Sequence, residues 1–589
     1  MSGRRVGVDT GGTFTDAVDN DGSFLKVPTT PADPAAAVAA ALGIAPVDVL
    51  AHGTTVATNA LVERRGARVA LITNEGMADV IEIGRQDRPS LYDHFADRPT
   101  PLVDRADRLE IAGRLDAAGL EVHPLGQPPS LPPGAQAIAI CLLHSDLNAA
   151  HEQSLQQILV TELPVSLSSD VAPEFREFER TVTTVLNAYL RPPCEDYLNR
   201  LTALATTALV MISAGGLVPI EFSTERPATL LLSGPAGGVR AGAAAARASG
   251  FPDAVTFDMG GTSTDVCLVR GGQPAPAAQR SVAGFPVRLP SLDIHTIGAG
   301  GGSIAYLDAG GALHVGPRSA GAQPGPVSYR LGGTEPTVTD ADLVAGRIPP
   351  AATFAGLETL DLAAAHASLE KLGVTAQDVI DVVDAAMVQA VRAVSVEQGV
   401  DPSGLALVAF GGAGPLHACA IAEALDMLAV IVPPRAGVLS AAGILAAPRQ
   451  HDVVRSWPTP LDHSNLTAAF EDLAAEAGCQ LTGDVTAAVD CRYAGQSHEL
   501  TVDEPSAFHE EHARRNGFAR EDAPVEVVAL RVRVTQAAPL DLADLPDPGG
   551  RRPANGPAVI PEPDSTIWIP PGWQATVHDS GAWVVTRKP

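Results

Sequence analysis

Lysine is the scarcest charged residue of this sequence, because only Lys26, Lys371 and Lys588 are present and arginine supplies the other basic side chains. Acidic residues outnumber basic ones, and the formal net charge is −28. A surface this acidic repels phosphate backbones, which argues against a nucleic-acid-binding protein. A loop of the type G-x-x-x-x-G-K-[ST] needs a lysine, and the sequence has no such loop, which excludes a P-loop enzyme.

Cysteine pairs and long apolar runs are also lacking. The six cysteines are scattered and form no C-x-x-C pair, so we expect reduced thiols in a cytoplasmic protein. No stretch approaches 18 apolar residues without a glycine or a charge, so we expect no membrane span. The start, MSGRRVGVDTGG, has no apolar segment, and we expect no signal peptide.

The remaining composition is that of a large globular protein. Aromatic residues make up only 4% of the chain and hydrophobic residues 46%, so the cores must be mainly aliphatic. A length of 589 residues allows several domains. Strand-like and helix-like segments alternate, which predicts an α/β fold. We predict a first lobe over 1–172, a second lobe over 173–450 and a small β-rich domain over 451–589.

Local patterns predict several individual elements. Residues 4–30 alternate apolar and turn residues in the manner of a three-stranded meander. A helix is expected to begin at Pro34 with Asp33 as its N-cap. A long amphipathic helix is expected over 376–398.

One octapeptide pattern occurs twice. Residues 9–16 read DTGGTFTD and residues 258–265 read DMGGTSTD, and each follows a β-branched run. A turn through two glycines brings backbone N–H groups together, and such a concavity binds phosphate oxygens. A single G-G-T turn is more often only a tight hairpin, but two matching turns favour a two-sided phosphate clamp. The predicted phosphate contacts are Gly11, Gly12, Thr13, Thr15, Gly260, Gly261, Thr262 and Thr264.

The aspartates of this pattern are the main catalytic candidates. Asp9 and Asp258 stand at strand ends, where their carboxylates suit Mg²⁺ held through water. We predict that both position metal and phosphate, and that Asp258 orients or deprotonates the attacking group. Asp16 and Asp265 end the turns, where they either cap loop N–H groups or contact the ligand.

A third glycine element follows late in the chain. In FGGAGPLH, Gly411, Gly412 and Gly414 precede an expected helix start. Such a turn lets an adenine ring and ribose approach the backbone closely, and the helix start favours negative charge. The run GAGGGS at 298–303 does not have the spacing of a dinucleotide-binding fingerprint.

Other polar residues are candidates for the second substrate. His52 can exchange a proton near neutral pH, and Thr54, Thr55 and Asn59 follow it closely. Arg85 is able to bind a phosphate or a carboxylate through two hydrogen bonds. For both His52 and Arg85, a packed or salt-bridged structural role is an equal alternative.

Two further patterns place histidines beside acidic residues. Asp293 and His295 have a metal-capable D-x-H spacing, so His295 is either a substrate contact, a metal ligand or neither. His509 and His512 stand in a charged stretch without a third ligand, and a solvated helix face is the better interpretation.

The order of two D-x-G-G-T-x-T-D hairpins and a late G-G-A-G resembles the actin-like ATPase superfamily. Longer stretches are similar to the hydantoinase A / 5-oxoprolinase family, and these cover nearly the whole chain. They are GVDTGGTFTDAV, HGTTVATNALVERRGARVALITNEGMADVIEIGRQDRPSLYD, CLLHSDLN, LLSGPAGGV, TFDMGGTSTDVCLV, DIHTIGAGGGSIA, GGTEPTVTDADLV, AFGGAGPLHA, RYAGQSHELTV and GPAVIPEPDSTIWIPPGW.

The resemblance implies a fold and a chemistry. The fold would be a two-lobed actin-like (ribonuclease H-like) ATPase with duplicated phosphate-binding hairpins and a C-terminal β-rich domain. The chain would use ATP and Mg²⁺ to phosphorylate the carbonyl oxygen of a lactam or cyclic imide. A B-type partner subunit would complete the hydrolysis in a hetero-oligomer. The alternatives are the ATP-using subunit of an acetone/acetophenone-type carboxylase and a nucleotide-switched interaction protein like actin or Hsp70.

Overall fold

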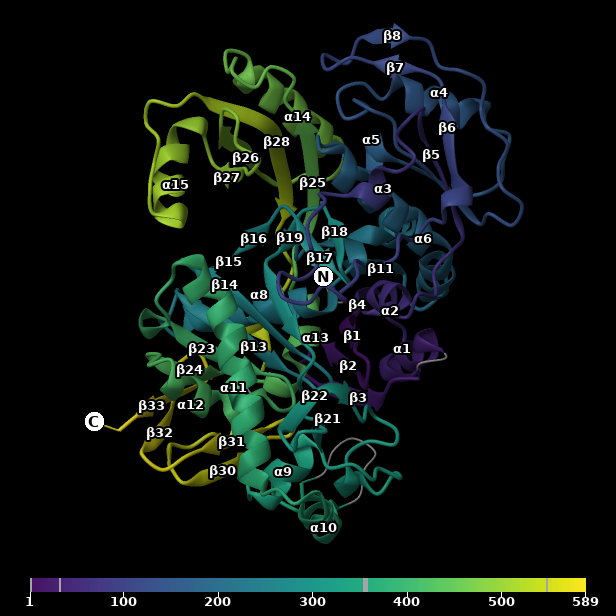
Figure 1. Ribbon diagram of the computed structural model, residues 1–589. Coiled ribbons are helices and arrows are strands. Elements are labelled where there is room, and N and C mark those ends of the chain that lie inside the picture. The colour runs from purple at the N-terminus through teal and green to yellow at the C-terminus, as the bar shows by residue number, and fades with distance from the viewer. Residues whose placement is uncertain (1–2, 31–32, 353–358, 547–548, 589) are drawn as a thin grey trace.

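The fold is described from a computed structural model that covers residues 3–30, 33–352, 359–546 and 549–588. Two large mixed sheets dominate it, one of ten strands and one of nine (Figure 1). We call the part around the ten-stranded sheet the first lobe and the part around the nine-stranded sheet the second lobe. Within the described ranges, no helix is both long and apolar enough to cross a membrane.

Each sheet draws its strands from distant parts of the chain. In spatial order, the ten-stranded sheet contains β27 (Leu500–Val502), β26 (Asp484–Tyr493), β28 (Val525–Gln536), β25 (Arg449–Ser456), β12 (Leu217–Pro219), β11 (Thr207–Met211), β4 (Val49–Thr54), β1 (Arg5–Thr10), β2 (Phe14–Asp19) and β3 (Phe24–Pro28). The nine-stranded sheet contains β15 (Gln273–Pro274), β14 (Thr264–Arg270), β13 (Ala254–Met259), β23 (Ala406–Phe410), β24 (Ala429–Val432), β33 (Trp583–Arg587), β32 (Trp573–Val577) and β29 (Ala554–Asn555), and β20 (Ile294–Ile297) pairs with β14. A four-stranded sheet of the first lobe contains β10 (Val165–Leu167), β9 (Ala137–Ile140), β5 (Val69–Asn74) and β6 (Arg108–Ile111).

The helices and short hairpins cover or connect these sheets. The helices of the first half are α1 (Pro34–Leu42), α2 (Val56–Val62), α3 (Val80–Ile83), α4 (Ala150–Ile158), α5 (Ser168–Val171), α6 (Glu177–Thr202), α7 (Ile220–Glu225) and α8 (Gly234–Ala248). Those of the second half are α9 (Val338–Val344), α10 (Leu362–Leu372), α11 (Ala376–Val394), α12 (Gly414–Ala424), α13 (Leu439–Leu445), α14 (Leu466–Gln480) and α15 (Phe508–Asn516). The two-stranded pairs are β7–β8 (Arg114–Leu115, Glu121–His123), β16–β19 (Pro276–Ala277, Ser291–Leu292), β17–β18 (Arg280–Val282, Phe285–Val287), β21–β22 (Ser303–Leu307, Leu313–Ser319) and β30–β31 (Ala558–Pro561, Thr566–Ile569).

Five strands of each large sheet follow the same order and the same directions. The order is β3-β2-β1-β4-β11 in the first lobe and β15-β14-β13-β23-β24 in the second. In each case an antiparallel meander of three strands is continued by two strands that run parallel to its third member. Both glycine turns therefore lie at the carboxyl ends of parallel strands, which is where open α/β sheets bind ligands.

Helices α8 and α13 pack between the two sheets at very short range. A Cβ atom on Gly443 would lie 2.0 Å from the carbonyl oxygen of Gly237, and one on Gly7 would lie 2.3 Å from that of Ala441. A buried cluster around Ile444 joins side chains of β4 and β11 to side chains of β14 and β20. Glycine is needed at these crossings because any side chain would push the lobes apart.

The meander and the two helices that local sequence patterns predicted are present in the structure. Strands β1, β2 and β3 form the expected meander. Helix α1 begins at Pro34, and Asp33 Oδ1 accepts a hydrogen bond from the backbone N–H of Ala36 at 3.1 Å. Helix α11 ends at Val394 instead of 398, and a 3-10 turn covers Val396–Gln398.

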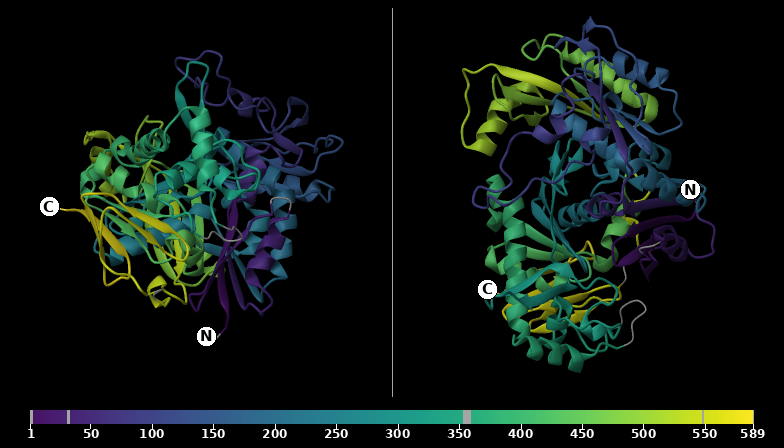
Figure 2. Two further views of the ribbon diagram at one scale, coloured as in Figure 1. Left: turned by 90° about the horizontal axis from the view of Figure 1, so that it is seen from below. Right: turned by 45° about the vertical axis from the view of Figure 1, so that its right-hand side comes forward.

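The region from residue 451 onward is rich in strands, as predicted, but most of these strands extend the two large sheets. Strands β25, β26, β27 and β28 continue the ten-stranded sheet, whereas β29, β32 and β33 continue the nine-stranded sheet. Figure 2 shows the yellow strands near the C-terminus far from the yellow-green strands around residue 500. Where the domain boundaries lie stays a prediction.

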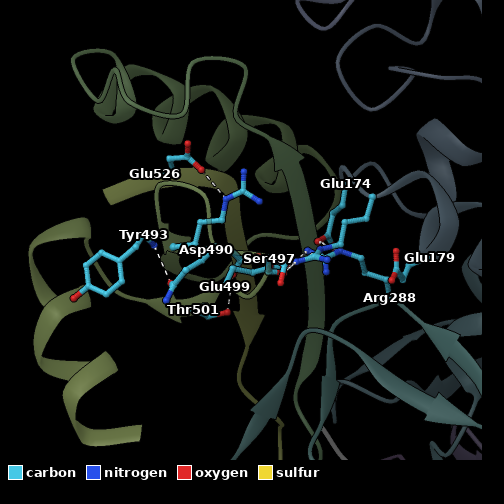
Figure 3. Close-up of polar contacts among 12 residues, drawn as sticks. Glu174, Glu179, Arg288, Asp490, Tyr493, Ser497, Glu499, Thr501 and Glu526 are labelled. Carbon is cyan, nitrogen blue, oxygen red and sulfur yellow. Dashed lines mark hydrogen bonds and ion pairs between the residues drawn. The ribbon is translucent and has the colours of Figure 1, made fainter. Parts of the chain in front are cut away.

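A buried ionic network joins strands β26 and β28 of the ten-stranded sheet to earlier segments of the chain (Figure 3). Arg531 Nη2 donates to Glu174 Oε2 at 2.9 Å and to Asp490 Oδ2 at 2.6 Å. Arg288 Nε donates to the same Glu174 oxygen at 2.8 Å, and its Nη2 lies 2.9 Å from Glu499 Oε1. All five side chains are at most 14% exposed, so their charges depend on one another rather than on water.

Asp490→Asn should lower the free energy of unfolding by about 3 kcal/mol, because removing one member of a buried ion pair leaves the other charge uncompensated. Glu476→Gln is the matched control, since Glu476 pairs with Arg455 at the exposed surface. The control should change the free energy of unfolding by less than about 1 kcal/mol. Urea denaturation measures both variants, and equal losses would contradict a special role of the buried network.

Candidate functional site

A cavity of about 860 Å³ lies where the two lobes meet. Its walls come from the β1–β2 turn, the β13–β14 turn, the loop between β23 and α12, and the starts of α2 and α8. The loop over residues 561–566, between β30 and β31, closes a further side. The cavity therefore collects segments from both ends and the middle of the chain.

The two hairpins that face this cavity have the same geometry. Asp9 lies opposite Asp16 in the register of the first hairpin, and Asp258 lies opposite Asp265 in the second. The backbone N–H of the first glycine closes each turn, with N···O distances of 3.0 Å and 3.1 Å. A Cβ atom on Gly261 would lie only 3.3 Å from Thr13 Oγ1, so the two turns meet across the cavity.

Four aspartates of these hairpins line the cavity and crowd their negative charges. Burial raises the pKa of Asp258 to about 7, and repulsion from Asp265 adds to this. Burial likewise raises the pKa of Asp265 to about 6. The pKa of Asp9 lies well above its ordinary value because of burial and of repulsion from Asp16 and Asp258.

The predicted cation fits this arrangement through bridging water. The Oδ1 atoms of Asp9 and Asp16 are buried without a hydrogen-bond partner among the described residues, and unpaired carboxylate oxygens suit a hard divalent cation. Within the described ranges, no three acidic, histidine or cysteine side chains converge closely enough to hold a metal ion by themselves. A cation here would therefore need additional ligands such as water and phosphate oxygens.

Lys26 is a site residue that sequence reasoning missed. Its Nζ donates to Asp16 Oδ2 at 2.9 Å and to the carbonyl oxygen of Gly437 at 3.3 Å. Ser440 Oγ, from α13, donates to Asp258 Oδ2 at 3.1 Å. The scarcity of lysine was the available signal, because one of only three lysines lies directly after the first hairpin.

The third glycine element passes beside the second hairpin, as its position in the chain predicts. Gly411 has φ +80°, and a Cβ atom there would lie 2.4 Å from Asp258 Oδ1. Gly412 also lines the cavity and has open space beside it. Gly414 begins α12 but packs against the backbone of Phe257, outside the cavity lining.

Asp342 lines the cavity near this element and is backed by a buried histidine. His417 Nε2 lies 3.2 Å from Asp342 Oδ2, and its Nδ1 lies 2.6 Å from Asp384 Oδ1. Burial alone would lower the pKa of His417, but the two carboxylates raise it to about 10. His417 is the histidine of the GGAGPLH motif, so the motif carries a second feature that glycine spacing alone does not reveal.

The glycine run at 298–303 braces the second hairpin. The backbone N–H groups of Gly301 and Gly302 donate to the carbonyl oxygens of Gly260 and Gly261 at 3.0 Å and 2.7 Å. A Cβ atom on Gly300 would lie 2.8 Å from the oxygen of Gly260. The density of glycine was the signal for this close approach of two backbones.

Thr15 and Thr264 were expected to contact phosphate, and the structure corrects this. Both are fully buried, with Thr15 Oγ1 3.0 Å from Thr29 Oγ1 and Thr264 Oγ1 donating to the Ala299 carbonyl at 2.7 Å. Successive residues of a strand point to opposite faces, so each threonine points away from the face that its neighbouring aspartate occupies. Thr13 and Thr262, within the turns, do line the cavity.

The expected acceptor residues Thr54, Thr55 and Asn59 line the first-lobe side of the cavity. Residues 232–235, at the start of α8, adjoin them, and the backbone N–H of Leu232 donates to Thr58 Oγ1 at 3.0 Å. This segment is part of the LLSGPAGGV stretch, whose role could not be inferred from the sequence. The structure thus joins two motifs that lie far apart in the chain.

His52 does not belong to the cavity. Its side chain is fully buried behind β4, and Nε2 lies 2.7 Å from Tyr197 Oη. Burial lowers the pKa of His52 to about 3, so the ring stays neutral at neutral pH. The packed alternative considered for His52 is thus the one its contacts support, because Tyr197 of helix α6 lies against the ring.

Arg85 and His295 also lie outside the cavity lining. Arg85 donates two hydrogen bonds to Glu179, at 2.8 Å and 2.5 Å, beside a separate hollow of about 340 Å³. Asp293 Oδ2, near His295, accepts a hydrogen bond from Gln398 Nε2 at 2.9 Å. The structural alternative considered for Arg85 is thus the one its contacts support.

The HEEH segment is not the solvated face that the sequence suggested. His512 is buried, and its Nδ1 lies 2.7 Å from the Phe518 carbonyl oxygen. His509 Nδ1 lies 2.9 Å from Tyr493 Oη. One face of α15 therefore packs on β26, although the intervening acidic residues remain accessible.

Comparison with known proteins identifies relatives along the whole chain. Residues 5–163 match the protein family described as "Hydantoinase/oxoprolinase N-terminal region". Residues 180–453 match the family described as "Hydantoinase/oxoprolinase". Caprolactamase subunit alpha of Pseudomonas jessenii is 33% identical over 99% of both chains. The gamma subunit of acetophenone carboxylase from Aromatoleum aromaticum is 34% identical over 74% of this chain and 67% of that protein.

A solved structure extends this similarity to the fold. The crystal structure of the ATP-dependent caprolactamase from Pseudomonas jessenii superposes with a TM-score of 0.85 and 31% identity. The match covers 99% of this chain and 100% of that chain. The chain therefore belongs to the hydantoinase/oxoprolinase family.

Proposed function

We propose that this chain is the ATP-dependent, A-type subunit of a cyclic-amide hydrolase, with an actin-like two-lobed fold. One observation carries the proposal: two hairpins of the same geometry face each other across one cavity, and each presents a pair of aspartates. The repeated five-strand order supports the actin-like relationship between the lobes. The ATP-dependence of the similar caprolactamase supports the choice of nucleotide.

In this proposal the nucleotide spans the second-lobe part of the cavity. The phosphates lie between the two turns, where glycine N–H groups and the hydroxyls of Thr13 and Thr262 donate hydrogen bonds. The adenosine lies against Gly411 and Gly412, where the chain has no side chains to block a flat ring. The γ-phosphate then points toward the first-lobe wall around Thr55.

The reaction transfers the γ-phosphoryl group to a carbonyl oxygen. The carbonyl oxygen forms a bond to phosphorus, and the bond between phosphorus and the bridging oxygen of ADP breaks. Mg²⁺, held through water by Asp9 and Asp258, would neutralise the charge that develops on the phosphate oxygens. Asp258, with its pKa near 7, is suited to orient the acceptor and to take up a proton.

The acceptor compartment is the wall made by Thr54, Thr55 and Asn59 together with residues 232–235. Phosphorylation of the carbonyl oxygen makes the amide carbon electrophilic, and it leaves phosphate as a good leaving group on the acyl carbon once the C–N bond has broken. Water then adds to the activated carbon, the C–N bond breaks as the ring nitrogen takes up a proton and leaves as an amine, and a second water hydrolyses the resulting acyl phosphate to carboxylate and phosphate. We assign these steps to a B-type partner subunit in a hetero-oligomer. The names of the relatives, a subunit alpha and a gamma subunit, support a multi-subunit assembly.

A ketone carboxylase is the second candidate, because the acetophenone carboxylase gamma subunit matches most of this chain. The same phosphoryl transfer would then activate a ketone as its enol phosphate, or bicarbonate as carboxyphosphate. The cavity walls described above serve either acceptor.

Turnover of ATP with candidate acceptors tests the proposal. The chain and its partner subunit are assayed with cyclic amides in one series and with ketones plus bicarbonate in the other. Stimulation by cyclic amides supports the hydrolase, and stimulation only by ketones with bicarbonate supports the carboxylase. If no acceptor stimulates ATP hydrolysis, with or without the partner, the chain is a nucleotide switch and the enzyme proposal is wrong.

Asp258→Asn should keep the fold and abolish ATP turnover, because asparagine provides neither the charge that attracts Mg²⁺ nor a proton acceptor. We expect a loss of at least about 100-fold in kcat, at the lower end of what general acid–base catalysis contributes. Asp472→Asn, at an exposed position of α14, is the matched control and should retain activity. Wild-type turnover in Asp258→Asn would refute the clamp model.

The same variant should change how stability depends on pH. The pKa of Asp258 is about 7 in the folded chain and about 3.9 when unfolded, so between these values the folded state holds more protons. Its contribution to the free energy of unfolding therefore falls as pH rises from about 4 to about 7 and is constant above. Without nucleotide and metal, Asp258→Asn should gain stability relative to wild type over this range, measured by thermal unfolding at several pH values. A difference that is independent of pH would argue against a raised pKa.

A further inference from the structure

We propose that the acceptor of this chain carries no anionic group, so that the substrate class is the neutral cyclic amide, cyclic imide or ketone. The inference rests on the proposed function, because it concerns the acceptor side of the same cavity. It separates this chain from enzymes whose lactam bears a carboxylate.

Acidic side chains greatly outnumber basic ones in the lining of the cavity. Its only basic lining residue within the described ranges is Lys26, and no arginine lines it there. The positions that the structure leaves undescribed contain neither lysine nor arginine. The acidic lining residues are Asp9, Asp16, Asp258, Asp265, Asp342, Glu562 and Asp564.

Two of these acidic side chains pair with a basic side chain that lies outside the cavity lining. Asp342 is backed by His417, and Glu562 by Arg551, which are themselves not part of the lining. Of the four hairpin aspartates and Asp564, only Asp16 forms an ion pair among the described residues, and its partner is Lys26. The electrostatic potential in the cavity is therefore negative before any ligand or cation enters.

Lys26 is not available to bind an acceptor carboxylate. Its Nζ is held by Asp16 Oδ2 at 2.9 Å and by the Gly437 carbonyl at 3.3 Å, and it lies 5.2 Å from the centroid of the Phe14 ring. Only 21% of its side chain is exposed. These contacts place it behind the first hairpin turn rather than at the acceptor wall.

The acceptor wall itself offers only neutral groups. Asn59 Nδ2 donates to Thr55 Oγ1 at 3.3 Å, and Thr58 Oγ1 is used by the backbone N–H of Leu232. An acidic group borders this wall, since Asp9 Oδ1 would lie 3.7 Å from a Cβ atom on Gly234. No described side chain of this wall thus offers a positive charge to a carboxylate on the acceptor.

The start of α8 supplies a weak positive potential at this wall. Its N-cap residue, Ser233, makes no capping bond and instead donates from Oγ to the Thr54 carbonyl at 3.3 Å. A helix start carries only about half an elementary charge, which decays within the first turn. This suits the partial charge of a carbonyl oxygen but does not balance a full carboxylate beside Asp9.

The arginine that the sequence offered as a carboxylate partner lies elsewhere. Arg85 is paired with Glu179 and borders the separate hollow, together with Arg176 and Arg492. Both of these arginines are also paired with glutamates. The chain therefore keeps these arginines away from the acceptor wall.

Matched pairs of acceptors test the inference with the chain and its partner subunit. One pair is 5-oxoproline and its carboxamide, which share the lactam ring and differ in charge. Equivalent pairs of larger cyclic amides, and 4-acetylbenzoate with 4-acetylbenzamide plus bicarbonate, cover other ring sizes and the carboxylase reaction. For pairs that react, we expect kcat/KM for ATP turnover to be at least about tenfold higher with the neutral member, which corresponds to about 1.4 kcal/mol.

A charge introduced at Asn59 makes the test specific to this wall. Asn59 is exposed, so its replacement removes little packing. Asn59→Lys should reduce the neutral-to-anionic ratio at least about threefold, since a cation then lies near the acceptor. Asn59→Gln adds length without charge and should leave the ratio within about twofold of wild type. The ratio within each variant cancels any general loss of activity.

The outcomes separate the two claims. If the anionic member of a pair stimulates turnover as well as or better than the neutral one, the inference is overturned and the proposed function stands. An unchanged ratio in Asn59→Lys also overturns it, because the wall would not face the acceptor. If no acceptor of either charge stimulates turnover, the proposed function falls and the inference falls with it.

Discussion

Repulsion among four aspartates at one cavity is the constraint on which the rest of this structure depends. Asp9, Asp16, Asp258 and Asp265 come from two hairpins that are far apart in sequence, and burial raises the pKa of every one of them. Such a cluster costs free energy in the protein by itself, since the described walls hold only one cation, Lys26. A ligand that brings cations with it relieves that cost, which is why the cluster fits a metal–nucleotide better than a free anion.

Strand pairing and backbone hydrogen bonds in both lobes hold the two hairpins in place. Each hairpin is continued by parallel strands, and the second is braced by the backbone of residues 298–303. Helices α8 and α13 cross between the sheets with glycines at the contact, so their backbones approach closely at that point. The strands after residue 451 extend both sheets, and those of the ten-stranded sheet are anchored by the buried charges around Arg531.

Sequence reasoning succeeded where the signal was local. The hairpin turns, the cap at Asp33 and the close approach of Gly411 depend on residues within a few positions of one another. It left a structural and a functional role open where the partner is remote. His52 faces Tyr197, 145 positions away, and Arg85 faces Glu179, 94 positions away, so neither contact is visible as a pattern. Thr15 and Thr264 were misjudged for a different reason, because the alternation of a strand turns them to the opposite face.

The sequence by itself determined the repeated turn chemistry, the scarcity of lysine and the family to which the chain belongs. These are properties of short segments and of composition, which do not depend on how the segments are arranged. Only the tertiary structure decided that both turns share one cavity, that the lysine in its described walls is already engaged and that Thr54, Thr55 and Asn59 form an uncharged part of those walls. Those properties arise from side chains that converge from distant segments, and the position of each is set by packing between lobes rather than by its neighbours in the chain.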